Sequence, residues 1–164
     1  MKSRITPTPR GAFSLTEMLV TILIIGVLAA IAIPVYSNIT ETSRRTVVQD
    51  HVEALNRAVT NFGHACWKFP TAANDSATTD EMAVVRSLQW KFPASSLKLG
   101  SPYFDPRYDP AGTSSTSEYR IRWNGKGFEM LDKGQAGSGL KYDGSSDYKP
   151  APYTFPSGYT PVGP

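Results

Sequence analysis

The apolar positions of this chain fall into one continuous block near the start and into shorter periodic stretches after it. From Met18 to Ile33 every residue is apolar or small except Thr21. With Phe13 and Leu15 the block reaches about 20 residues, which as a helix spans about 30 Å of hydrocarbon. The block therefore predicts a single membrane-spanning helix.

A periodic pattern continues this helix beyond Pro34. Five apolar residues recur at spacings of four, three, four and three, which forms one stripe along a helix: Val48, Val52, Leu55, Val59 and Phe62. Gly63 follows as a C-terminal stop. We therefore predict one helix from Phe13 to Phe62, about 75 Å long, with a transmembrane N-terminal half and an amphipathic C-terminal half.

The remaining residues predict a small head. The sequence Thr78-Thr79-Asp80-Glu81 is typical of a capping box and predicts a short helix through about Gln89, with Met82, Val85 and Leu88 as its apolar positions. Apolar and polar residues then alternate over 119–123 and 128–130 around the turn signal Asn124-Gly125, which predicts a β-hairpin with one apolar face. That face is the expected cover of the helix stripe, so the predicted fold is α+β: a long N-terminal helix packed on a small antiparallel sheet.

The C-terminal segment, Lys141 to Pro164, contains four tyrosines, five prolines and three glycines. This composition favours extended or irregular structure. Two hypotheses remain: a mobile tail, or a tail anchored by its tyrosines on the head or on a neighbouring subunit.

Charge gives the orientation of the helix. Lys2, Arg4 and Arg10 precede the apolar block without any acid among them, and without these three the chain has 14 basic and 14 acidic side chains. By the positive-inside rule the N-terminus stays in the cytoplasm and the head crosses the membrane. Basic and acidic residues are mixed through the head, which argues against nucleic-acid binding.

Glu17 is the most informative residue of the block, because an ionised carboxylate in hydrocarbon costs on the order of a few kcal/mol unless it has a partner. No Lys, Arg or His lies between Glu17 and Arg44. A plain membrane anchor, or a secretory signal peptide cut after Ala32, leaves the acid unexplained. Cleavage just upstream would create a partner, since an α-amine on Phe13 lies one helical turn before Glu17.

Phe13-Ser14-Leu15-Thr16-Glu17 and the apolar run 18–34 resemble the N-terminal motif of type IV pilins and type II secretion pseudopilins. In this register Glu17, Gly26 and Pro34 match the glutamate, mid-helix glycine and proline of the family without a gap. One departure concerns the residue before the cut, which is usually glycine in the family and is Ala12 here.

The resemblance implies that a prepilin peptidase removes residues 1–12 by cleaving between Ala12 and Phe13 and methylates Phe13. Cleavage between Gly11 and Ala12 is the alternative. Glu17 would neutralise the amine of an adjacent subunit, and Gly26 and Pro34 would kink the helix. Residues 13–36 would then form the transmembrane and filament-core helix, and residues 37–164 the exported head.

The function implied is that of a structural, non-enzymatic filament subunit, held in the inner membrane by a single pass and then carried into a periplasmic or extracellular filament. Its partners would be identical or homologous subunits and an inner-membrane assembly platform. Cys66 is the only cysteine, which excludes the C-terminal disulfide loop common in pilins and favours a secretion-type pseudopilin. The alternatives are a minor pilin of an adhesion or DNA-uptake pilus, and a permanently anchored periplasmic binding module.

Other candidate chemistry is sparse. His64 and Cys66 are two potential ligands without a third, and helix-end packing is the preferred interpretation. Asp143, Ser145 and Asp147 are the only calcium candidate, and without the terminal glutamate of an EF-hand loop a solvated turn is preferred. The sequence contains no phosphate-binding loop, nucleophile elbow or zinc-protease helix. We therefore predict no metal, no cofactor and no enzyme activity.

Overall fold

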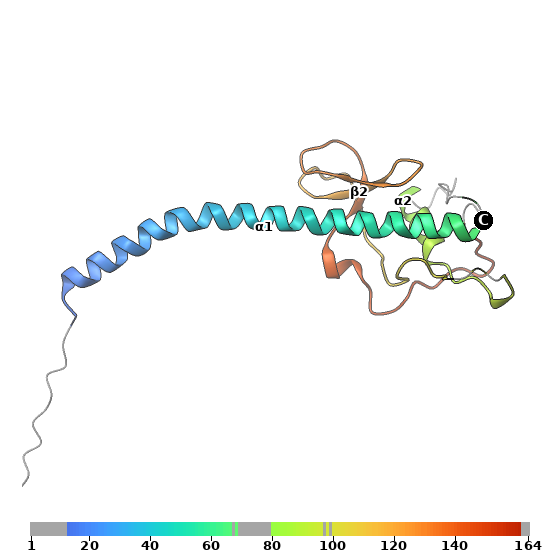
Figure 1. Ribbon diagram of the computed structural model, residues 1–164, viewed down its shortest axis with the longest axis horizontal. Helices are drawn as coiled ribbons and strands as arrows, with labels where there is room; N and C mark the ends of the chain where they lie inside the picture. Colours follow the sequence, from blue (N-terminus) through green and yellow to red (C-terminus); the bar gives the residue numbers. More distant parts are fainter. Residues whose placement is uncertain (1–12, 67, 69–79, 97, 99, 162–164) are drawn as a thin grey trace, which may run out of the picture. The chain divides into compact units, whose positions relative to one another are not determined.

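The computed structural model describes residues 13–66, 68, 80–96, 98 and 100–161. Its elements in chain order are α1 (Leu15–Cys66), α2 (Asp80–Gln89), η1 (Ala94–Ser96), β1 (Gly112–Thr113), β2 (Arg120–Trp123), β3 (Phe128–Leu131), β4 (Gly139–Lys141) and η2 (Gly144–Asp147) (Figure 1). A long helix and a small antiparallel sheet confirm the predicted α+β class. The chain divides within α1 into two compact units, Met1–Ser43 and Arg44–Pro164.

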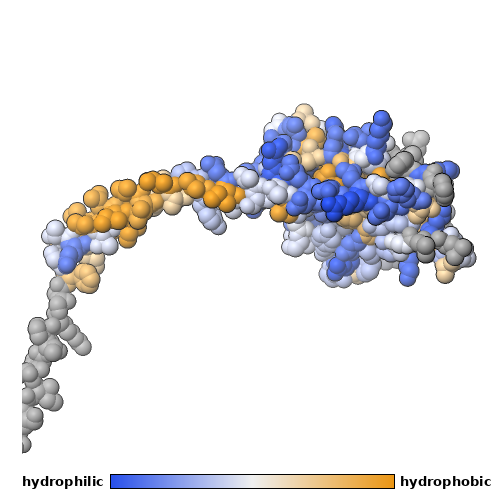
Figure 2. Space-filling view, viewed as in Figure 1, coloured by the Kyte–Doolittle hydropathy of each residue, from blue (hydrophilic) through white to orange (hydrophobic). Residues whose placement is uncertain are grey.

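The N-terminal unit consists, in its described part, of the first half of α1 and the two residues before it. Its large apolar side chains from Leu15 to Ile39 are all exposed, and Figure 2 shows them as a continuous hydrophobic surface. The helix is long and apolar enough to cross a membrane, and none of its most apolar window is buried within the protein. The helix continues through Pro34, and the Ser37 hydroxyl donates to the Pro34 carbonyl at 2.9 Å.

The C-terminal unit, called the head below, has one hydrophobic core. The predicted stripe of α1 is buried in full, and Ala58 and Cys66 join it. Side chains of α2 and of the sheet complete the core, among them Val85, Leu88, Ile121, Trp123, Phe128 and Leu140. The periodicity of α1 therefore identified the face that the rest of the head covers.

Both ends of α1 differ from the prediction. The helix passes through Gly63 and ends at Cys66, so the predicted stop at Gly63 is wrong. Two contacts explain the extra turn: Cys66 is buried in the core, and the Lys98 ammonium donates to the Ala65 carbonyl at 2.9 Å. A long-range lysine thus satisfies one of the carbonyls that a helix end leaves without an intrahelical partner.

The helix α2 follows the predicted one closely, ending at Gln89. The capping residues Thr78 and Thr79 lie outside the described residues. Along α2, Val84 and Ala83 are buried in addition to Val85 and Leu88, because this helix has neighbours on more than one side.

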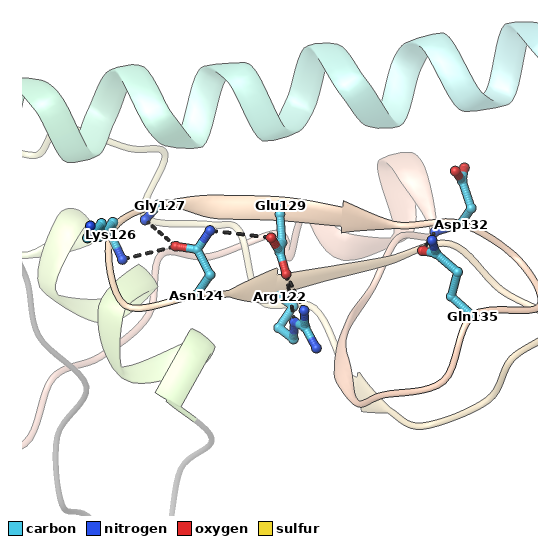
Figure 3. A network of polar contacts seen from close by, with 7 residues as sticks. All are labelled: Arg122, Asn124, Lys126, Gly127, Glu129, Asp132 and Gln135. Atoms are coloured by element: carbon cyan, nitrogen blue, oxygen red, sulfur yellow. Dashed lines mark hydrogen bonds and ion pairs between the residues drawn. The ribbon is translucent and has the colours of Figure 1, made fainter.

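The sheet has the order β1-β4-β2-β3, and all its neighbouring strands are antiparallel. The predicted hairpin is β2–β3, with Trp123 opposite Phe128. The side-chain oxygen of Asn124 accepts hydrogen bonds from the backbone N–H groups of Lys126 and Gly127, both at 3.0 Å. The side-chain NH₂ group of Asn124 donates to the Glu129 carboxylate (Figure 3). The turn expected at Asn124-Gly125 is present, and the Asn124 side chain holds it.

Strand β3 is an edge strand whose outer side faces α1, which runs alongside the hairpin (Figure 3). The Asn56 side chain of α1 accepts the Phe128 N–H at 2.7 Å and donates to the Phe128 carbonyl at 2.9 Å. A single amide side chain therefore pairs with the strand as a further strand would. Gly127 permits this approach, because a Cβ there would lie 2.9 Å from Asn56 Oδ1.

The described part of the C-terminal segment is packed on the head, which supports the anchored tail rather than the mobile one. Tyr142 and Tyr148 pack against the core, and Tyr148 forms a bridge with Tyr108. Farther along, Trp90 of the chain after α2 forms an aromatic cluster with residues of the tail: Tyr153, Phe155 and Tyr159. The Arg86 guanidinium lies 3.6 Å from the centre of the Tyr153 ring.

Candidate processing and docking site

The start of α1 is organised by a capping box. The Ser14 hydroxyl accepts the Thr16 N–H at 3.3 Å, and the Glu17 carboxylate accepts the Ser14 N–H at 2.9 Å. The first helical hydrogen bond runs from the Met18 N–H to the Ser14 carbonyl. Ser14 is therefore the N-cap and Glu17 the third helical residue, in the reciprocal arrangement that Ser-x-x-Glu sequences favour.

This arrangement corrects the expected start of the helix. In the uncleaved chain α1 begins at Leu15, so Phe13 lies before it, and the expected position of a Phe13 amine one turn before Glu17 in the cleaved chain stays a prediction. The physical reason is the cap, since the N-cap residue leaves the helical conformation to bond the exposed N–H groups. The Ser-x-x-Glu signal was present in the sequence at 14–17 and was missed there. Gly11 and Ala12 lie outside the described residues.

Glu17 has a hydrogen-bond partner in its own chain, yet no cation of residues 13–43 offsets its charge. One N–H satisfies part of a carboxylate that can accept about four hydrogen bonds. Among residues 13–43 the sequence contains no Lys, Arg or His. The Thr21 hydroxyl donates to the Glu17 carbonyl, which leaves the carboxylate itself untouched. The complement of Glu17 is therefore a cation from outside residues 13–43.

Gly26 and Pro34 lie on the exposed apolar surface of α1. A Cβ at Gly26 would meet nothing within 4 Å, so the described residues of the chain give no steric reason for glycine there. The kink expected at these two positions stays a prediction.

The second set of sequence candidates lies in the head. Among the described residues no group of three His, Cys, Asp or Glu side chains is arranged to hold a metal. Cys66 is buried, and burial raises the pKa of its thiol while the nearby Lys98 opposes that shift. His64 lies near it on the exposed side of the last turn of α1. His64 and Cys66 thus both belong to the C-terminal end of α1.

The calcium candidates share the turn η2, with Asp143 just before it. The Lys141 ammonium lies 3.0 Å from Asp143 and 2.7 Å from Glu118, which places a cation of the chain beside these carboxylates. Asp147 is buried, accepts the Asp143 N–H at 2.7 Å, and has a pKa raised chiefly by burial.

The head also has an open groove of about 690 Å³ between α1 and the loop 102–107. Tyr103 and Phe104 line it, together with Arg57 and Arg107. Both arginines are already paired, with Glu53 at 2.6 Å and Asp105 at 2.7 Å. The lining includes no serine, cysteine or histidine, so it offers none of the usual nucleophile and base pairs.

Comparison with known families concerns the start of the chain. Residues 8–33 match the family described as the prokaryotic N-terminal methylation motif, which is the leader signature of type IV pilins and pseudopilins. The resemblance of the N-terminal segment is thereby confirmed, and the match supports a pilin-like or pseudopilin subunit. Pilins of this kind are structural proteins. Neither a curated protein nor a solved structure gave a significant match to the chain.

Proposed function

We propose that this chain is the precursor of a structural subunit of a type IV pilin-like filament, and specifically of a type II secretion-like pseudopilin. The observation that carries the proposal is the methylation motif at residues 8–33, which leads into an exposed apolar helix. In this account a prepilin peptidase cleaves between Ala12 and Phe13 and methylates the amine of Phe13. The head has no catalytic role.

Docking depends on the charge of Glu17. Its carboxylate lies at the start of a helix whose exposed surface suits hydrocarbon, where an unpaired charge costs on the order of a few kcal/mol. The amine of Phe13 on a neighbouring subunit carries a charge of opposite sign and lies at the same apolar end of its helix. Pairing the two removes both penalties and fixes the axial position of one subunit against the next.

The remaining apolar surface has two successive environments in this account. Before assembly the helix spans the inner membrane once, with the N-terminus in the cytoplasm. In the filament the same surface is covered by helices of identical or homologous subunits, through heterologous contacts that do not close into a ring. Extraction from the membrane is the task of an assembly platform.

The choice of a secretion-type filament rests on the head. Its single cysteine, Cys66, is buried at the end of α1, so the C-terminal segment is held without a disulfide. Aromatic packing and hydrogen bonds hold it instead, including one from the Lys149 N–H to the Arg107 carbonyl at 2.9 Å. Secretion assays with a deletion strain separate this role from that of a pilus.

The docking role is tested by imaging filaments from strains with Glu17→Gln, Glu17→Ala and Ser37→Ala. Glu17→Gln keeps an oxygen that can accept the Ser14 N–H and loses the charge, so it separates charge pairing from helix capping. Ser37→Ala is the matched control, since it removes an exposed hydroxyl from the same helix.

We expect both Glu17 variants to reach the membrane and form no filaments, while Ser37→Ala assembles as the parent does. Normal filaments from Glu17→Gln would show that the charge is not needed, and the docking role would then be wrong.

A further inference from the structure

His51 of α1 lies inside a set of four aromatic rings, called the aromatic box here. Its ring centre is 4.7 Å from that of Tyr108, 5.3 Å from Tyr142, 5.7 Å from Phe104 and 6.4 Å from Tyr148. Two of these rings come from the loop before β1 and two from the chain after β4. The box therefore joins α1 to two segments that are distant in sequence, all within the head.

Two polar atoms in the box have no hydrogen-bond partner among the described residues. They are His51 Nε2 and Tyr108 Oη, and both are inaccessible to solvent. A neutral imidazole tolerates such a site better than an imidazolium does, because the charged ring would lose its hydration without gaining an acceptor. Burial accordingly lowers the pKa of His51 to about 4.

The charged groups around the box do not offset this effect. In the loop, Asp105 is paired with Arg107, which holds its pKa below the usual range. In the C-terminal segment, Asp147 accepts the Asp143 N–H, and burial raises its pKa. The phenols of Tyr108, Tyr142 and Tyr148 have pKa values raised by burial, so they stay neutral. On α1 itself, the neighbouring Asp50 is exposed to solvent.

The C-terminal side of the box is held by few backbone contacts. The Asp109 N–H donates to the Asp147 carbonyl at 2.8 Å, and the Lys149 N–H donates to the Arg107 carbonyl at 2.9 Å. These two bonds flank Tyr108 and Tyr148 and form the single bridge between them, and the rings of the box provide the other contacts of segment 144–149 with the box. A local opening here would hydrate His51 without separating β2 from β3.

We propose that His51 and the aromatic box form an acid-sensitive latch, in which protonation of His51 releases segment 144–149 from α1 while the sheet stays folded. The latch is closed at neutral pH. The direction follows from proton binding: between pH 6.5 and about 4 the open form binds a proton that the closed form does not. Acidification through that window therefore favours opening. Asp147, whose pKa is raised, acts in the opposite sense at the low end of the window.

Amide hydrogen exchange of the full chain in detergent micelles tests the latch, measured by NMR at pH 7, 5 and 4 with correction for intrinsic exchange rates. The reporters are the amides of Asp109 and Lys149, and the reference is Glu129 in the β2–β3 ladder. We expect the opening constant of the reporters to rise on the order of 10- to 100-fold between pH 7 and 4, with Glu129 unchanged. Equal loss of protection at Glu129, or no change at the reporters, would overturn the proposal.

Two variants identify the titrating group. His51→Phe keeps an aromatic ring that cannot be protonated and should abolish the pH dependence, whereas His64→Gln, which removes the only other histidine, should leave it intact. Persistent acid opening in His51→Phe would contradict the latch. A direct NMR titration of the parent protein needs no variant to fold: His51 should titrate near pH 4, and titration near 6.5 would refute the burial argument.

Discussion

Asn56→Ala removes the side chain that pairs α1 with the edge of the sheet. Its two hydrogen bonds, at 2.7 and 2.9 Å, engage the N–H and carbonyl of Phe128, a residue only 4% exposed. Each bond contributes about 1 kcal/mol net, and a buried group left without a partner costs about 1 to 3 kcal/mol. Because β3 is an edge strand, we expect water to replace part of the hydrogen bonding that the Phe128 backbone loses. The predicted decrease in the free energy of unfolding is about 2 to 4 kcal/mol.

The assay is urea unfolding of the full chain in micelles, followed by fluorescence of the tryptophans, of which Trp123 is packed against Phe128. The control is Asn61→Ala, the same substitution on an exposed position of the same helix. We expect Asn61→Ala to stay within about 0.5 kcal/mol of the parent. Equal effects of the two substitutions would refute the role of Asn56 as a strand mimic.

Two further predictions concern the head. Gly139→Ala should lower the free energy of unfolding by at least about 2 kcal/mol, because its Cβ would lie 2.7 Å from the Ile121 carbonyl oxygen and the backbone would have to shift; a thermal melt within error of the parent would contradict this. Calcium should leave the melting temperature unchanged, since Lys141 already neutralises Asp143. A true site would add about 2.7 kcal/mol at one hundred times its dissociation constant, so a clear calcium-dependent rise, reversed by a chelator, would show that the preferred interpretation of this loop is wrong.

Patterns with several repeats were sufficient to predict much of the fold. The apolar stripe from Val48 to Phe62 identified the buried face of α1, and alternation around Asn124-Gly125 identified the β2–β3 hairpin. Strands β1 and β4 were not predicted, because two and three residues are too few to show alternation. Their pairing depends on contacts distant in sequence, such as Gly112 opposite Leu140.

The errors at the ends of α1 have two different causes. At the start, Ser14 and Glu17 form a capping box that the sequence Ser-x-x-Glu indicates, so the helix begins after Ser14 and not at Phe13. At the end, Gly63 suggested a stop, whereas burial of Cys66 and the bond from Lys98 extend the helix. The second effect is tertiary, so no local pattern predicts it.

The aromatic box shows the same limit for a candidate site. His51 lies on the helix near the predicted stripe, and nothing in its neighbourhood in sequence distinguishes it from a surface histidine. Its partners come from two segments far along the chain, namely Phe104 with Tyr108 and Tyr142 with Tyr148. Only the folded head brings them together.

The mature N-terminus shows most directly whether this chain is a processed filament subunit. We would determine the intact mass and N-terminal sequence of the membrane-associated protein from its native host, with and without prepilin peptidase. We expect a methylated Phe13 that depends on the peptidase; a terminus at Ala12 would keep the processing and move the cleaved bond. An intact Met1 would favour the anchored module, and a free Ile33 would indicate a secreted protein. Either result would show that the chain is not a processed filament subunit.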